Sequence, residues 1–148
     1  MTNKNMNLNT RKPFLLRPSG KDYLWGGKRL NDEFVKNIDM DPLAETWECS
    51  THPDGLSFVA GKDISLAEVL AEHPDYLGTH PSMEGELPVL IKFIDANKDL
   101  SVQVHPGDEY AYRRENGQLG KTEMWYVLDA AKDAQIIYGL VTDVSKEE

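Results

Sequence analysis

A strictly alternating segment, residues 100–105, constrains the fold of this chain more than any other feature. Its residues fall into an apolar set and a polar set: Leu100, Val102 and Val104, and Ser101, Gln103 and His105. Because successive side chains of a strand point to opposite faces, the alternation predicts a β-strand on which Gln103 and His105 point the same way. A polar face of this kind either meets water or lines the inside of a β-structure, and the pattern alone leaves both open.

A second polar group follows after a short connection, in the sequence Gly-Lys-Thr-Glu at 120–123. Lys121 and Glu123 are two residues apart, so a strand here would point an ammonium and a carboxylate toward the same side. Together with Gln103 and His105, they place an amide, an imidazole and a carboxylate within a short stretch of chain. Nitrogen and oxygen donors of this kind indicate a metal site if the polar faces lie inside.

Short strand-like segments separated by turn residues dominate the rest of the chain. Residues 45–50 and 56–60 are predicted to form a hairpin, because the Pro-Asp-Gly between them presets φ at the proline and allows positive φ at the glycine. The remaining predicted strands are 13–17, 88–96, 122–128 and 134–140. Many short strands with few helices predict a mainly β fold, either a sandwich or a small barrel.

Two short helices are predicted between the strands. Ser65 and Glu68 form a capping box, which predicts a helix that begins there and stops before Pro74. Asp108 can cap a second helix that ends near Gly117.

Size, charge and cysteine content narrow the class of protein. A chain of 148 residues fits one domain, expected at 13–148 after a disordered, asparagine-rich leader at 1–12. A net charge of −9 argues against nucleic acid and an acidic membrane surface as partners. The sequence shows no signal-peptide or membrane-span pattern, so a cytoplasmic location is expected. Because Cys49 is the sole cysteine, there is no intrachain disulfide, and a metal would need nitrogen and oxygen ligands.

Lys92 is a further candidate functional residue. It lies in the most apolar segment of the chain, between Ile91 and Phe93. A lysine in such a place either has a partner or a cavity, which is frequent at functional sites, or extends its head group to water from the strand end. The pattern alone leaves both interpretations open.

Five motifs together resemble those of type I phosphomannose isomerases, over about residues 13–140. In chain order they are Ala-Glu-Thr-Trp-Glu at 44–48, His-Pro-Asp-Gly-Leu-Ser at 52–57, Leu-Ile-Lys-Phe-Ile-Asp-Ala at 90–96, Leu-Ser-Val-Gln-Val-His-Pro at 100–106 and Gly-Lys-Thr-Glu-Met-Trp-Tyr at 120–126. The resemblance implies a cupin, a β-jelly roll whose inward-facing polar residues hold zinc. It also implies the interconversion of mannose 6-phosphate and fructose 6-phosphate.

The resemblance implies roles for individual residues as well. The expected zinc ligands are Gln103, His105 and Glu123. The expected catalytic residues are Lys92 and Lys121, which supply positive charge, and Glu48, a candidate general base. Ser101 and Lys121 are expected to bind the sugar phosphate.

The chain departs from the family in its length. Family members are much longer, and the resemblance places a further histidine ligand and a phosphate-facing arginine beyond the matching part. We therefore expect the N-terminal half of the enzyme, with an incomplete jelly roll whose open sheet edge could pair with another copy. Two alternatives to an isomerase stay open: a non-catalytic metal-bearing cupin that binds sugar phosphate, and an inert structural fragment that dimerises through that edge.

Overall fold

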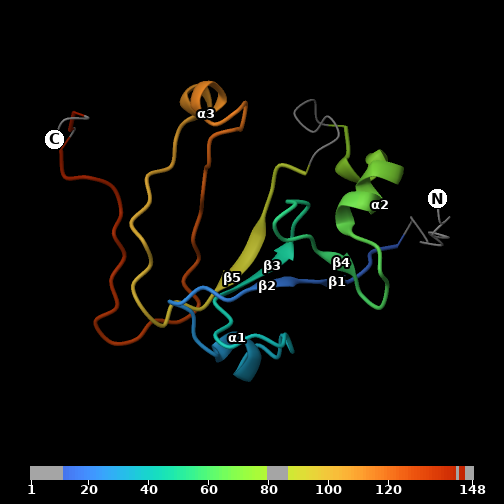
Figure 1. The fold of residues 1–148 in the computed structure, drawn as a ribbon, viewed down its shortest axis with the longest axis horizontal. Helices are drawn as coiled ribbons and strands as arrows, with labels where there is room; N and C mark the ends of the chain where they lie inside the picture. Colours follow the sequence, from blue (N-terminus) through green and yellow to red (C-terminus); the bar gives the residue numbers. More distant parts are fainter. Residues whose placement is uncertain (1–11, 80–86, 143, 146–148) are drawn as a thin grey trace. The chain divides into compact units, whose positions relative to one another are not determined.

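The computed structural model describes residues 12–79, 87–142 and 144–145 (Figure 1). Contacts divide the chain into two compact units, Met1–Leu100 and Ser101–Glu148, called unit 1 and unit 2 below. The predicted leader falls outside the described residues except at its last position. None of the helices in the described segments is long and apolar enough to cross a membrane.

The strands that the described residues form all belong to unit 1, where they make two small antiparallel sheets (Figure 1). β1 (Leu16–Arg17) pairs with β4 (Phe58–Val59). β3 (Glu45–Cys49) lies between β2 (Ser19–Lys21) and β5 (Ile91–Ile94). The predicted mainly β class is confirmed, although four of these strands are shorter than their predicted segments and β2 was not predicted.

The predicted hairpin between 45–50 and 56–60 is wrong. The backbone N–H of Gly55 closes the expected turn, but β3 and β4 belong to different sheets. The backbone N–H of Ser57 donates to the carbonyl of Ser50 at 2.9 Å, but the N–H of Ser50 donates to the side-chain Oγ of Ser57 at 3.0 Å, where a hairpin would have used the carbonyl of Ser57. A side-chain bond has therefore replaced part of the expected ladder.

The helix predicted from the capping box is confirmed as α2 (Leu66–Glu72). The N–H of Glu68 donates to Oγ of Ser65 at 3.1 Å, and the N–H of Ser65 donates to Oε2 of Glu68 at 2.8 Å. Two backbone donors that the helix itself leaves unpaired are thereby satisfied. The helix stops before η1 (Pro74–Leu77), as the proline predicted.

The core of unit 1 lies where α2 meets the two-stranded sheet. Val59, Ile64 and Val69 form a buried cluster, and Phe14 and Tyr76 pack against it. The rings of Phe14 and Tyr76 meet edge to face, with centroids 5.9 Å apart. This apolar contact fixes the helix on the sheet that β1 and β4 make.

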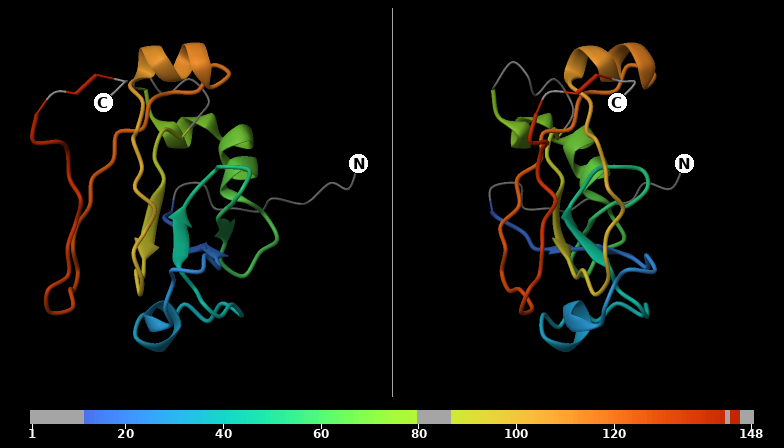
Figure 2. Two further views of the ribbon diagram at one scale, coloured as in Figure 1. Left: turned by 60° about the vertical axis from the view of Figure 1, so that its left-hand side comes forward. Right: turned by 90° about the vertical axis from the view of Figure 1, so that its left-hand side faces the viewer.

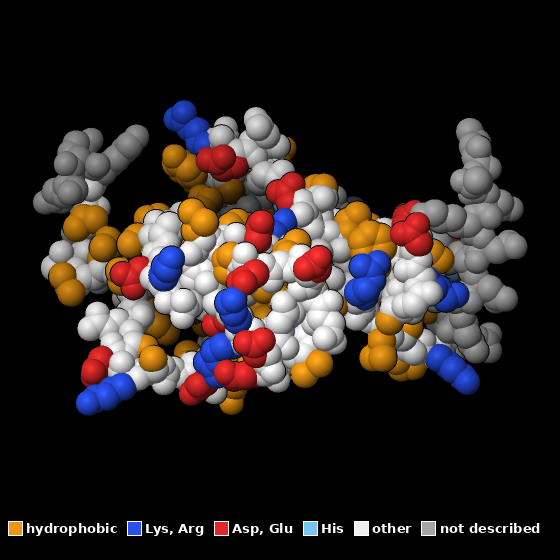
Figure 3. Space-filling view, turned by 60° about the horizontal axis from the view of Figure 1, so that its bottom comes forward, with side chains coloured by type: hydrophobic (Ala, Val, Ile, Leu, Met, Phe, Trp, Pro, Cys, Tyr) orange, Lys and Arg blue, Asp and Glu red, His pale blue; other side chains and the backbone are white. Residues whose placement is uncertain are grey.

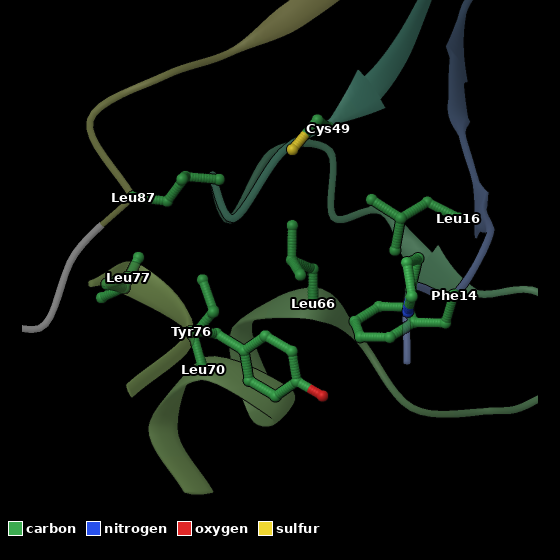
Figure 4. Close-up of a pocket in the computed structure, with 9 residues that line it drawn as sticks. Phe14, Leu16, Cys49, Leu66, Leu70, Tyr76, Leu77 and Leu87 are labelled. Carbon is green, nitrogen blue, oxygen red and sulfur yellow. The ribbon is translucent and has the colours of Figure 1, made fainter. Parts of the chain in front are cut away.

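An apolar pocket of about 320 Å³ adjoins this core (Figure 4). Leu66 and Tyr76 lie along one side of it, and Cys49 lies on the other. Burial raises the pKa of the Cys49 thiol, because a thiolate is poorly solvated among apolar side chains.

Three segments predicted as strands, at 100–105, 122–128 and 134–140, form no strand. Figure 2 shows the latter two as extended chain that runs in opposite directions on either side of a turn. Their apolar side chains are exposed, as for Val104 at 93% and Tyr138 at 97%. The strand prediction is wrong here because alternation supplies a strand-like sequence, whereas a strand also needs a paired neighbour for its backbone groups.

The second predicted helix exists as α3 (Asp108–Arg114), but its cap differs from the prediction. Gly107 occupies the N-cap position, and Asp108 is the first helical residue. The carboxylate of Asp108 accepts a hydrogen bond from the backbone N–H of Gly120 at 2.8 Å. The helix ends just before Gly117, whose φ of 81° is readily adopted by glycine.

Candidate functional site

Unit 2 brings two of the predicted metal ligands into direct contact. Nε2 of His105 lies 2.9 Å from Oε2 of Glu123, although the residues are 18 positions apart in the chain. Both side chains are about three-quarters buried, with exposed fractions of 28% and 23%. An imidazole and a carboxylate in contact within such a partly shielded place can hold a cation or exchange a proton.

Lys121 completes a charged cluster around this carboxylate. Its Nζ lies 3.3 Å from Oε1 of Glu123, so the two oxygens of Glu123 have different partners. Burial raises the pKa of Glu123, but hydrogen bonds from His105, Lys121 and Trp125, together with the charge of Lys121, outweigh it and hold the pKa below its ordinary value. Glu123 is therefore a carboxylate at neutral pH, which is the form that a metal requires.

Gln103 and Ser101, also in unit 2, are hydrogen-bonded to each other. Nε2 of Gln103 donates to Oγ of Ser101 at 3.2 Å. The two side chains share a side of the backbone, as the alternation predicted, and Ser101 orients the Gln103 amide. The ligand role of Gln103 and the phosphate-binding role of Ser101 stay predictions.

The donor set in unit 2 fits zinc in chemistry and in spacing. Two ligand atoms of a tetrahedral site with bonds of about 2.0 Å lie about 3.3 Å apart. The 2.9 Å between Nε2 of His105 and Oε2 of Glu123 requires only a small separation to reach that value. No group of three or more His, Cys, Asp or Glu side chains gathers in the described part of the chain. The third predicted ligand, Gln103, is not one of these residue types.

Lys92, in unit 1, has a partner rather than an exposed head group. It lies opposite Trp47 in the register between β3 and β5, and its Nζ donates to Oε1 of Glu45 at 3.1 Å. The second oxygen of Glu45 accepts from the indole N–H of Trp47 at 2.8 Å. The ammonium is thus held by a nearly buried carboxylate, and of the two interpretations left open by the sequence, the partnered one is confirmed.

Glu45 is a functional candidate that sequence reasoning missed. Its two carboxylate oxygens are used by Lys92 and Trp47, so it fixes both side chains on one face of the sheet. The available signal was the spacing of Glu45 and Trp47, which are two apart on a strand and hence share a face. The prediction named Glu48 instead, because nothing in the sequence showed which strand lies opposite.

Glu48 lies on the other face of the same sheet. Its Oε1 is 2.9 Å from Nζ of Lys36 and 2.5 Å from the hydroxyl of Thr46, which donates to it. Thr46 faces Phe93 in the register, whereas Trp47 faces Lys92, so Glu48 and Lys92 point to opposite sides. As placed, Glu48 stabilises Lys36, and its role as a general base stays a prediction that this geometry does not favour.

Comparison with known proteins assigns the family. A sequence profile described as phosphomannose isomerase type I, catalytic domain, matches residues 14–136. The chain is 45% identical over 133 residues to the probable mannose-6-phosphate isomerase GmuF of Bacillus subtilis, covering 86% of this chain and 41% of that protein. It is 44% identical over 140 residues to the mannose-6-phosphate isomerase of Streptococcus mutans, covering 93% and 43%. The chain thus spans about two fifths of the length of these curated relatives.

A solved structure agrees with the sequence comparison. The mannose 6-phosphate isomerase from Bacillus subtilis superposes with a TM-score of 0.74 at 38% sequence identity, covering 82% of this chain and 39% of that one. This likeness confirms the predicted fold class. On these grounds the chain belongs to the type I phosphomannose isomerase family.

Proposed function

We propose that this chain provides the N-terminal part of a zinc-dependent isomerase that interconverts mannose 6-phosphate and fructose 6-phosphate. The contact between His105 and Glu123, at 2.9 Å, is the observation that carries the proposal. It joins the two family motifs that the sequence separates, and it does so with a donor pair suited to zinc. The names of the relatives, mannose-6-phosphate isomerases, support mannose 6-phosphate as a substrate.

The chemistry of the reaction explains the need for positive charge. Moving the carbonyl of the sugar from C1 to C2 requires removal of a proton from carbon and an intermediate with negative charge on its oxygens. Zinc, when bound, supplies a positive centre for those oxygens. In the proposal, His105 and Glu123 hold the metal together with Gln103.

Lys121 has two tasks in the proposed site. It pairs with Glu123, which keeps that carboxylate ionised, and its ammonium stays about half exposed, at 47%. A partly exposed ammonium beside the ligands can contact the oxygens or the phosphate of a sugar phosphate, and Ser101 adds a hydroxyl for the same phosphate. Lys92, held by Glu45, is proposed as a second source of positive charge for the reaction.

An acidic chain can bind a phosphorylated sugar because local charge governs a site more than net charge. Figure 3 shows acidic and basic side chains interspersed over the visible face, with no continuous basic stripe on it. In the proposal, attraction for the phosphate comes from individual placed cations, and Lys121 is the one in unit 2.

The test is a coupled assay for fructose 6-phosphate on the zinc-loaded chain. Glu123→Gln is expected to lower turnover by more than about 100-fold, since loss of a ligand exceeds the 10–100-fold effect typical of residues that support ligands. Glu109→Gln, the same change at an exposed residue paired with Arg113, is the control and is expected to keep wild-type turnover. Absence of turnover above background in the wild-type chain would refute the isomerase proposal.

The non-catalytic alternative is separated by calorimetry on the same sample. Binding of mannose 6-phosphate without turnover would support a metal-bearing cupin that only binds sugar phosphate. The other alternative, an inert structural fragment that dimerises through its open sheet edge, is tested by light scattering, because a dimer has twice the mass of the chain.

A further inference from the structure

The contact between His105 and Glu123 forms without the support that such contacts usually have. In a sheet, the backbone ladder between two strands sets which residues face each other. Neither the segment of His105 nor that of Glu123 is a strand. Their relative position must come from other bonds, and the described residues provide two close to the site.

The first of these bonds comes from a side chain. Oδ1 of Asp108 accepts a hydrogen bond from the backbone N–H of Gly120 at 2.8 Å. A bond from a backbone amide to an ionised carboxylate is roughly twice as strong as one between neutral groups. The second bond joins the N–H of Lys121 to the carbonyl of Pro106 at 3.3 Å, next to the first along both segments.

The close approach of the backbones adds a second constraint. A Cβ placed on Gly120 would lie 2.7 Å from the backbone N of Asp108, 2.7 Å from the carbonyl oxygen of Pro106 and 2.8 Å from the carbonyl carbon of Gly107. All three are backbone atoms, which cannot move aside as a flexible side chain can. Only glycine allows the 120–123 segment to pass this close to the end of the 101–106 segment.

From these contacts we propose that Asp108 is a positioning residue, which together with Gly120 sets the pairing of His105 with Glu123. Asp108 follows His105 by three residues, and Gly120 precedes Glu123 by three. The bond between Asp108 and Gly120 therefore lies three residues along the chain from the contact between His105 and Glu123, on each of the two segments. The N-cap of α3 is Gly107, so Asp108 directs its carboxylate to the neighbouring segment rather than capping its own helix. The importance of this pairing for metal binding rests on the proposed function, whereas the pairing itself does not.

Three variants of the full chain test the proposal. Asp108→Ala removes the acceptor, and Asp108→Asn keeps a side-chain oxygen that can accept the same bond. Glu109→Ala is the matched control, because it removes one carboxylate from the same helical turn and loses only an exposed pair with Arg113. Two readouts are used: the ring ¹⁵N chemical shifts of His105 in the metal-free chain, which report its contact with Glu123, and the affinity for Zn²⁺ measured by competition with a chromophoric chelator.

Asp108→Ala is expected to change the His105 ring shifts and to weaken zinc binding by about 10–100-fold, the range for residues that orient ligands. Asp108→Asn is expected to restore most of both, and Glu109→Ala to match the wild type. Unchanged ring shifts and zinc affinity in Asp108→Ala, or an equal loss in Glu109→Ala, would overturn the proposal.

Gly120→Ala gives a second test that keeps every carboxylate. It is expected to alter the His105 ring shifts as Asp108→Ala does, because the added methyl separates the two backbones. Wild-type ring shifts in Gly120→Ala would contradict the proposed positioning. A wild-type chain that binds no Zn²⁺ counts against the proposed function, and the ring shifts then decide the positioning role by themselves.

Discussion

Unit 1 and unit 2 differ in what holds each of them together. Unit 1 contains all the strands formed by the described residues, and its core residues, such as Leu43 and Val69, are fully buried. In the described part of unit 2, Ala111 is the one buried hydrophobic residue, while Trp125, Ile137 and many others are exposed. Yet unit 2 carries the three predicted zinc ligands. The proposed chemistry therefore lies in the unit whose structure depends on single hydrogen bonds rather than on a packed core.

The largest expected effect contrasts one substitution in the two units. Leu43→Ala is expected to lower the free energy of unfolding by about 2–5 kcal/mol, because Leu43 is fully buried and its loss leaves a cavity. Leu128→Ala in unit 2 is expected to change it by less than about 0.5 kcal/mol, because Leu128 is exposed. Urea denaturation measures both. Equal losses would show that unit 2 has a core of its own.

A smaller effect is expected from the buried pair in unit 1. Glu45→Ala leaves the indole N–H of Trp47 and the ammonium of Lys92 without their acceptor, at a cost of about 1–3 kcal/mol. Glu109→Ala removes a carboxylate from an exposed pair in unit 2 and is expected to cost under about 1 kcal/mol. Thermal unfolding of the two variants compares them. A larger loss in Glu109→Ala would reverse the proposed difference between the units.

The helix cap of α2 is expected to contribute less again. Ser65→Ala removes the side-chain acceptor of the capping box and is expected to destabilise the chain by about 1 kcal/mol. Ser101→Ala makes the same chemical change in unit 2, where the hydroxyl accepts a bond from the exposed amide of Gln103, and a smaller loss is expected. The urea midpoints of both variants provide the measurement. A neutral Ser65→Ala would contradict the role of the capping box in stabilising unit 1.

The smallest effect concerns the reactivity of Cys49 in unit 1. Because burial raises the pKa of its thiol, a smaller fraction is thiolate at pH 8 than in an unstructured peptide. Alkylation by iodoacetamide is therefore expected to be slower in the native chain at pH 8, and its rate is expected to rise at a higher pH than in the peptide. Both differences are expected to vanish in urea. A native alkylation profile with its midpoint at or below the pH found for the peptide would mean that this side of unit 1 is open to water.

The sequence predicted local structure well and pairing poorly. The capping box of α2 and the proline that ends it act over a few residues, so Ser65 and Glu68 were sufficient to place that helix. The partner of β4 is β1, more than forty residues earlier in the chain, and no local pattern reports such a contact. The alternation of 100–105, which enters unit 2 at Ser101, predicted a strand, but alternation cannot supply the neighbouring strand that a ladder needs.

The candidate site shows the same division. The motifs that contain His105 and Glu123 were sufficient to predict that these two residues come together. That prediction came from the family pattern and not from local geometry. Glu45 was missed, because its function depends on Lys92, which reaches it from β5. Asp108 was predicted as a helix cap, whereas its carboxylate bonds to Gly120 on another segment. Side chains whose partners are distant in the chain are those for which the structure was needed.

Hydrogen exchange of the full chain with and without Zn²⁺ tests the central claim most directly, namely that the metal is held by unit 2. In the absence of metal, the amides of β3 and α2 are expected to exchange slowly and those of 101–106 and 120–126 rapidly, because protection follows burial and regular hydrogen bonding. Addition of Zn²⁺ is expected to slow exchange in 101–106 and 120–126 and to leave β3 and α2 unchanged. Protection that appears only in unit 1, or none at all with saturating Zn²⁺, would contradict the account.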